Sequence, residues 1–242
     1  MPNETCYNRM ESIPLRLMGR HKPQELLARS TIFLIAGSLL VGCDSNKPMP
    51  KQELHLSAPI QIQIDLKDPS RSFGVLPVGE QRRLFKVGYG RHGVTCAGTQ
   101  FEEGYTPLGR FVVNAILSKD QFAMDKDLVV RSGKSEKELR KTLFANMNSI
   151  DFSGDGESGE YGIGYISLAP INSVKQPFSF NKYNGTFRWY SFAMHGSNNE
   201  AKVGDRVTGG CLNLGEPVLA SMLKIVRLGD TVEIRANGSC TP

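Results

Sequence analysis

The chain has 242 residues, a length that supports one sizeable domain with short appendages. Hydrophobic residues make up 40% of it and charged residues 22%, which is ordinary for a globular protein, and the formal net charge is only +5. Such mild basicity, without a basic cluster that interleaves with aromatic residues, argues against a nucleic-acid-binding protein. No internal repeat is present.

The first 42 residues have the pattern of a targeting segment. Basic residues precede an apolar run over 32–41, which is too short to span a bilayer and has the order of a signal peptide. The run ends in Leu-Val-Gly-Cys, an arrangement that resembles a bacterial lipobox with Cys43 as the lipidated residue. The alternative is an ordinary secretory signal in which Cys43 is incidental. We therefore predict a lipoprotein signal segment at 1–42 and an exported protein.

The residues after Cys43 predict a short tether between a lipid anchor and the folded part of the chain. Residues 43–56 include a polar stretch with prolines, so we expect a lipidated N-terminus and a tether that hold the domain near the membrane. Asp44 resembles an inner-membrane retention signal. It favours a periplasmic protein anchored in the inner membrane, with the outer membrane as the alternative. The domain is then predicted to cover 57–242.

Within 57–242, several segments show the pattern of β-strands. Apolar and polar residues alternate over 60–66, which indicates a half-buried strand. Further strands are predicted at 83–89, 111–117, 161–168, 188–194 and 231–235. Ser135 and Glu138 form a capping box before a short amphipathic helix, and a second helical pattern follows Gly215. Many strands and few helices predict a β-rich α+β fold, a mixed sandwich or barrel with a few short helices.

His195 and Cys211 form a candidate nucleophilic pair. Thiolate is a strong nucleophile, and an imidazole accepts the thiol proton and later returns one to a leaving group. His195 ends a predicted strand, which is a rigid position for a base. Because a helical pattern begins near Pro217, we expect the helix N-terminus to lower the pKa of Cys211. The alternative is a buried cysteine that packs as a small hydrophobe beside an unrelated histidine.

Two ordered sequence blocks resemble those of the L,D-transpeptidase (YkuD-type) catalytic domain family. One is Tyr-Thr-Pro-Leu-Gly-Arg-Phe at 105–111, and the other is His195-Gly196 followed by Thr-Gly-Gly-Cys-Leu-Asn at 208–213. The resemblance implies a mixed β-sandwich with the active site at one end, Cys211 as the nucleophile and His195 as the base. The chain departs from the pattern at Gly209, where many members carry a second histidine.

Other residues of the two blocks have expected roles. The resemblance implies that the backbone carbonyl of Gly196 orients the imidazole. The backbone N–H groups of Gly210 and of the residue after it are candidate donors to an oxyanion. Asn213 is expected to support the cysteine loop, with simple packing as the alternative. Arg110 and Thr106 are candidates for substrate binding. Arg110 would pair with a carboxylate of the peptidoglycan stem peptide that the family uses as substrate, and an ordinary surface arginine is an equal alternative.

Two cysteines remain once Cys43 carries lipid and Cys211 serves as the nucleophile. Export to an oxidising compartment favours a disulfide between Cys96 and Cys240, whereas two buried free thiols are the alternative. No metal or organic cofactor is implied.

Residues 119–183 match no block of the family, and we expect them to form a lid or insertion over the site, where substrate preference resides.

The resemblance implies an envelope L,D-transpeptidase that acts on peptidoglycan stem peptides. In this hypothesis Cys211 forms a thioester with the third residue of a tetrapeptide stem, and an amine on a second stem or on an envelope protein resolves it. The first alternative is a cysteine hydrolase, a carboxypeptidase or amidase, that acts on stems or wall-attached proteins. The second alternative, from a different class, is a wall-binding module without turnover.

Overall fold

The computed structural model describes residues 54–95, 99–100, 102–147, 149–153, 159–171, 178–179 and 192–240. All of them belong to one compact unit, Lys51–Pro242. The predicted signal segment, the predicted lipidation site Cys43, Asp44 and Cys96 lie outside the described residues. No helix in the described part of the chain is long and apolar enough to cross a membrane.

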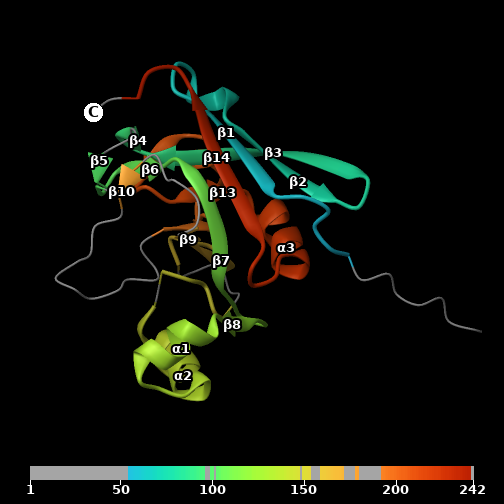
Figure 1. Ribbon diagram of the computed structural model, residues 1–242, viewed down its shortest axis with the longest axis vertical. Helices are drawn as coiled ribbons and strands as arrows, with labels where there is room; N and C mark the ends of the chain where they lie inside the picture. The colour runs from blue at the N-terminus through green and yellow to red at the C-terminus, as the bar shows by residue number, and fades with distance from the viewer. Residues whose placement is uncertain are drawn as a thin grey trace, which may run out of the picture. The chain divides into compact units, whose positions relative to one another are not determined.

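A mixed sheet that closes on itself forms the body of the domain (Figure 1). Its ring contains, in spatial order, β3 (Gln81–Gly90), β13 (Leu212–Leu214), β11 (Ala193–His195), β9 (Gly164–Pro170), β7 (Gly109–Ser118), β14 (Thr231–Asn237), β1 (Ile60–Asp65) and β2 (Phe73–Val78). Pairing of β2 with β3 closes the ring. Most neighbouring strands are antiparallel, whereas β1 with β14 and β11 with β13 are parallel.

Shorter strands are attached to this ring or lie beside it. Two of them extend the main sheet: β12 (Arg206–Thr208) pairs with β3, and β8 (Phe122–Met124) pairs with β7. Two small sheets form from β4 (Gly93–Thr95) with β6 (Tyr105–Pro107) and from β5 (Thr99–Gln100) with β10 (Phe178–Ser179). The pairing of β4 with β6 brings the segment around Thr106 next to the end of β3.

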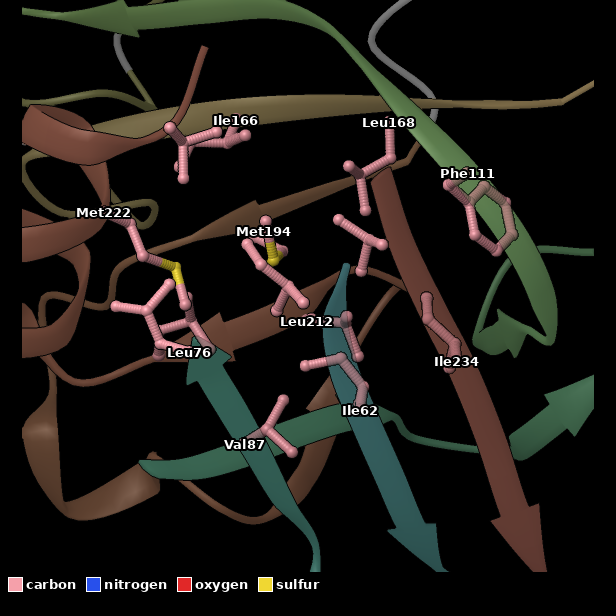
Figure 2. Close-up of a cluster of buried hydrophobic side chains, with 14 of the residues drawn as sticks. Ile62, Leu76, Val87, Phe111, Ile166, Leu168, Met194, Leu212, Met222 and Ile234 are labelled. Carbon is pink, nitrogen blue, oxygen red and sulfur yellow. The ribbon is translucent and has the colours of Figure 1, made fainter. Parts of the chain in front are cut away.

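One face of the sheet builds the main hydrophobic core because alternate residues of each strand point to the same side. In β1, for example, Ile60, Ile62 and Ile64 are each at most 2% exposed. Figure 2 shows core side chains from several strands converging with Met222 of α3 (Glu216–Ile225). The N-terminus of this helix is capped by a residue from outside it, because the backbone N–H of Glu216 donates to the carboxylate of Glu200.

The opposite face of β7 carries a pair of short helices, α1 (Lys126–Ser132) and α2 (Glu136–Asn146). Their apolar residues Leu128 and Leu139 pack with Ala115 of β7 and Met124 of β8. Figure 1 shows α1 and α2 together next to β8, apart from α3. The helix predicted from the capping box is confirmed, because the Ser135 side chain accepts the N–H of Glu138 and the Glu138 side chain accepts the N–H of Ser135.

The fold class predicted from the sequence is confirmed: the domain is rich in strands, with a closed barrel-like sheet and short helices. The strands predicted at 60–66, 83–89, 111–117 and 231–235 correspond to β1, β3, β7 and β14. The strand predicted at 161–168 begins only at Gly164, because Gly162 adopts a φ of 60° in a turn. Most of the strand predicted at 188–194 lies outside the described residues.

Candidate active site

The register of three adjacent strands aligns a row of polar side chains on one face of the sheet. Tyr165 of β9 lies directly opposite His195 of β11, and His195 lies directly opposite Asn213 of β13. Residues directly opposite one another in a sheet project to the same side. All three side chains therefore share the face that lies away from the main core, whose strand residues are the intervening Ile166 and Met194.

The same register brings Cys211 close to His195. Cys211 directly precedes β13, and extending the pairing of β11 with β13 by one residue puts it opposite Ala193. Residues two apart on a strand share a face, so Cys211 and His195 are diagonal neighbours. Strand geometry separates their backbones by about 4.8 Å across and about 6.6 Å along the sheet. Ala193, which lies opposite Cys211 on the same face, has only a small side chain.

The His195 imidazole is buried and held in one orientation. Its Nδ1 lies 2.7 Å from the carbonyl oxygen of Gly196, and because a carbonyl only accepts, Nδ1 is assigned the proton. Nε2 is then the basic nitrogen. The Tyr161 ring packs on the imidazole at a centroid distance of 4.2 Å, and Tyr165 lies nearly parallel to it at 6.3 Å. Burial lowers the pKa of His195 to about 4, and the bond to Gly196 opposes this effect.

The environment of the Cys211 thiol favours its protonated form. Burial raises its pKa to about 11, although two donors to the sulfur, the backbone N–H of Ala193 and the hydroxyl of Tyr165, act in the opposite direction. The side chain packs with the apolar cluster of Leu117 and Tyr165, while the residue keeps part of its surface exposed. Both donors can stabilise a thiolate once the proton leaves.

The expectation that a helix N-terminus lowers the pKa of Cys211 is wrong. The whole of β13 separates Cys211 from the first residue of α3, Glu216. At about 3.3 Å per extended residue the helix begins on the order of 15 Å away, and the field of a helix end fades within its first turn. The backbone N–H of Glu216 is moreover bound at 2.8 Å by the carboxylate of Glu200.

The loop before Cys211 is held by Thr208. Its hydroxyl donates to the carbonyl oxygen of Cys211 at 2.5 Å and accepts the backbone N–H of Gly210 at 3.1 Å. Gly210 has a φ of 129°, a backbone conformation that a residue with a side chain rarely adopts. Because Thr208 occupies the N–H of Gly210, this group is not available as the oxyanion donor that the sequence suggested. The N–H of Cys211 remains the candidate.

Thr106 lies under this loop and cannot meet a substrate. It is 0% exposed, its hydroxyl accepts the backbone N–H of Gly90 at 2.8 Å, and it donates to the carbonyl oxygen of Gly210 at 2.7 Å. The expected substrate contact is therefore replaced by a structural one. Arg110 is exposed on β7, opposite Glu233 of β14, and is not among the described residues that line the pocket.

Asn213 is buried at 3% exposure and supports a neighbouring segment rather than the cysteine loop itself. Its side-chain N–H donates to the carbonyl oxygen of Lys202 at 3.2 Å, which fixes the short 3-10 helix η2 (Glu200–Lys202) beside the site. A Cβ atom at Gly88 on the adjacent strand would lie only 1.9 Å from the Asn213 Oδ1. Glycine at 88 is thus required for Asn213 to fit.

A pocket of about 710 Å³ opens over these side chains. The described residues that line it are Arg91, Glu103, Glu160, Tyr161, His195, Gly196, Ser197, Asn198, Lys202, Val207, Thr208, Gly209, Cys211 and Asn213. The pocket therefore combines a thiol, a base with a fixed tautomer and a rim that carries charges of both signs. This combination suits nucleophilic attack on the carbonyl of a polar substrate.

Tyr161 and Tyr165 are the functional residues that the sequence analysis missed. Both lie within the segment 119–183, which was expected to form a lid or insertion; part of this segment is instead β9, a central strand of the ring, and Tyr161 contacts the His195 imidazole. Tyr165 is only 1% exposed, and a buried tyrosine hydroxyl needs a partner. The signal in the sequence was the position of Tyr165 in a predicted strand near His195, but the pairing of the two strands could not be read from the sequence.

A comparison with models of known protein families finds a match. A family model described as the L,D-transpeptidase catalytic domain (YkuD) matches residues 59–234. A search of curated proteins finds no match.

Among solved structures, an L,D-transpeptidase from Mycobacterium smegmatis is 16% identical over 74% of this chain and 59% of its own, with a TM-score of 0.35. An L,D-transpeptidase from Xylanimonas cellulosilytica is 14% identical over 78% and 64%, with a TM-score of 0.36. L,D-transpeptidase 3 from Mycobacterium tuberculosis, in complex with a faropenem-derived adduct, is 11% identical over 73% and 60%, with a TM-score of 0.37. The chain thus covers less than two thirds of the length of each. Because the family model matches most of the chain, the protein belongs to the YkuD family of L,D-transpeptidase catalytic domains.

Proposed function

We propose that this protein is a cell-envelope L,D-transpeptidase that acts through a Cys211 thioester on tetrapeptide stems of peptidoglycan. The observation that supports the proposal is the diagonal placement of Cys211 and His195 on one sheet face under a pocket of about 710 Å³. Family membership supports the class of reaction. The acceptor to which the stem is then joined is an amine on a second stem or on an envelope protein.

In the first half of the reaction, the Cys211 sulfur attacks the carbonyl carbon of the third stem residue. The thiol proton passes to Nε2 of His195, whose Nδ1 stays bonded to the Gly196 carbonyl. The peptide bond to the terminal D-alanine breaks, and its nitrogen takes the proton from Nε2. In the second half the acceptor amine attacks the thioester carbon, His195 removes its proton, and the Cys211 sulfur leaves as a thiolate that is reprotonated.

Burial disfavours an ion pair between His195 and Cys211 in the resting site. The pKa of His195 is lowered to about 4 and that of Cys211 is raised to about 11, so both shifts oppose a thiolate–imidazolium state. We infer that proton transfer accompanies formation of the sulfur–carbon bond instead of preceding it. The Tyr165 hydroxyl and the Ala193 N–H support the sulfur as it becomes negative. The Cys211 N–H is the donor that we assign to the oxyanion.

A carbapenem and a purified stem fragment together test the proposal. We expect one covalent carbapenem adduct per chain by intact mass, lost in Cys211→Ser, and an acylation rate lowered by about two to four powers of ten in His195→Ala. His55→Ala, which changes a histidine outside the pocket, is the matched control. With a tetrapeptide fragment, cross-linked dimers support transfer, whereas trimmed monomers indicate the hydrolase. Neither adduct nor turnover with folded protein points to a wall-binding module and overturns the proposal.

We further propose that lipid on Cys43 anchors the domain in the membrane, as the resemblance to a lipobox implies. Stable anchoring takes two acyl chains, which a lipidated N-terminal cysteine carries. Cys43→Ala is expected to release the protein from the membrane fraction, and fractionation with antibody detection measures this. If the variant stays in the membrane fraction, the hydrophobic run at 32–41 is the anchor and the lipid assignment is wrong.

A further inference from the structure

The outer face of the hairpin formed by β2 and β3 presents exposed apolar side chains. Val75 of β2 lies directly opposite Leu84 of β3, and Phe73 lies two residues from Val75 on the same face. Leu84 is 72% exposed and Phe73 is 41% exposed. A single exposed leucine is ordinary, but neighbouring apolar side chains on one open face indicate a surface that meets a partner.

Cations flank these apolar side chains. Arg82 and Lys86 are each two residues from Leu84 on β3, so all three share the outer face. Both cations are exposed, and neither forms an ion pair with a residue that the structure describes. The same stretch of chain adds one more exposed cation, Arg83, against a single carboxylate, Glu80. The surface therefore suits an anionic partner that also offers apolar groups. We call Phe73, Val75, Arg82, Leu84 and Lys86 the hairpin patch.

The chain enters the folded domain beside this hairpin. Leu56 forms an antiparallel bridge with Val78, the last residue of β2. Followed back toward the N-terminus, an antiparallel partner of β2 runs toward the turn of the hairpin. The 11 peptide units between Cys43 and Leu54, the first described residue, reach at most about 40 Å. A membrane that holds a lipid on Cys43 is therefore within reach of the hairpin patch.

The pocket lies at the opposite end of β3. This strand begins at Gln81, next to the turn of the hairpin, and ends at Gly90. Gly90 pairs with Thr208 of β12, which lines the pocket. At about 3.3 Å per residue, the strand from Gln81 to Gly90 spans roughly 30 Å. Figure 1 shows the hairpin on the side of the domain opposite β4 and β6. A surface bound at the hairpin patch thus leaves the pocket open.

We propose that the hairpin patch docks on an anionic phospholipid bilayer, the one that holds the N-terminal anchor. Leu84 and Phe73 enter the region between headgroups and acyl chains, while Arg82 and Lys86 bind lipid phosphates. The inference rests on the proposed anchoring. Because the anchor makes docking intramolecular, a contact too weak to keep the free protein in the membrane fraction is sufficient. Docking in this way directs the pocket away from the bilayer, toward the peptidoglycan.

Fluorescence quenching tests the docking with the full-length lipidated protein in vesicles. The vesicles contain phosphatidylglycerol and phosphatidylcholine with brominated acyl chains, which quench only tryptophans that enter the bilayer. Leu84→Trp introduces the probe, and the emission of the native protein, which has one tryptophan, is subtracted. We expect the introduced tryptophan to be quenched and its emission to shift to the blue. Val130→Trp, at a position of α1 that is 78% exposed, is the matched control and should show neither change.

Charge variants made in the Leu84→Trp protein test the contribution of the cations. Arg82→Gln should lower the ratio of docked to free hairpin about fivefold, the contribution of one cation near an anionic surface. Lys126→Gln removes an exposed cation of α1 and should leave this ratio unchanged. Vesicles of phosphatidylcholine alone should lower the ratio more than Arg82→Gln does, because Lys86 then also loses its anionic partner.

The possible failures give different results. If the protein does not float with the vesicles on a density gradient, the proposed anchoring is wrong and the docking falls with it. Flotation without quenching at position 84, or with stronger quenching at position 130, overturns the docking alone. A blue shift at position 84 that grows with the number of proteins per vesicle, and not with the share of anionic lipid, identifies a second copy of the chain as the partner and also overturns it.

Discussion

Replacing Thr106 with valine tests whether a buried hydroxyl holds the nucleophile loop. Valine keeps the volume of threonine but leaves the backbone N–H of Gly90 and the carbonyl of Gly210 without their partner, which lies 2.8 Å and 2.7 Å away in the native protein. Each buried polar group left unpaired costs about 1–3 kcal/mol. Carbonyl groups tolerate this better than N–H groups, so we expect the free energy of unfolding to fall by about 2–4 kcal/mol.

Urea denaturation measures this loss, and Thr106→Ser is the matched control. Serine keeps the hydroxyl and removes one buried methyl group, which costs about 1 kcal/mol. Because Gly210 precedes the nucleophile directly, the valine variant should also acylate more slowly at saturating substrate, with KM nearly unchanged. If the valine variant keeps its stability to within about 0.5 kcal/mol and instead shows a raised KM, the hydroxyl contacts the substrate and the buried-bridge argument is wrong.

Further predictions concern the thiol, the base and the remaining cysteines. Tyr165→Phe removes a hydroxyl donor to the Cys211 sulfur and should raise the pKa of the thiol, slowing its alkylation at pH 8 by about 10-fold or more; an unchanged alkylation profile would exclude the contact. The pKa of His195 falls from 6.5 to about 4 on folding, so the folded state binds fewer protons in that window. The contribution of His195 to stability should therefore be complete at neutral pH, and stability should decrease by up to about 3 kcal/mol as the pH falls from 6.5 toward 4; His195→Asn should flatten this dependence. Cys240 is disulfide-bonded, and peptide mapping without reductant should recover it linked to Cys96, which lies outside the described residues; a different partner would refute the pairing.

Local patterns in the sequence predicted the parts of the fold that depend on neighbouring residues. The alternation over 60–66 is enough to identify β1, and the capping box at Ser135 marks the start of α2, because both depend on contacts within a few residues. The prediction that the N-terminus of α3 lowers the pKa of Cys211 failed because it depended on an arrangement in space that neighbouring residues do not determine. It assumed that closeness in sequence means closeness in space, whereas β13 is extended and carries the helix N-terminus away from the thiol.

The roles of buried polar side chains could not be predicted in the same way. Thr106 lies in a motif next to the site, but only its bonds to Gly90 and Gly210, which are distant in sequence, show that its side chain lies beneath the loop. Tyr165 reaches the thiol because β9 and β11 pair in one particular register, which no short-range pattern encodes. Thr208 likewise occupies a backbone N–H of Gly210 that the sequence left open for catalysis.

The parallel pairing of β11 with β13 has a consequence for how such a site can change. The spacing between His195 and Cys211, the proposed base and nucleophile, is set by the pairing of these two strands, not by the length of the chain that joins them. The chain between Gly196 and Thr208 can therefore change in length while His195 and Cys211 stay in place, provided that it still offers the Lys202 carbonyl to Asn213 and the Glu200 carboxylate to Glu216, and that β12 still pairs with β3. Strands β11 and β13 thus position His195 and Cys211, whereas the loop between them lines the pocket. Substitutions in that loop can therefore change which substrate binds without moving these two residues.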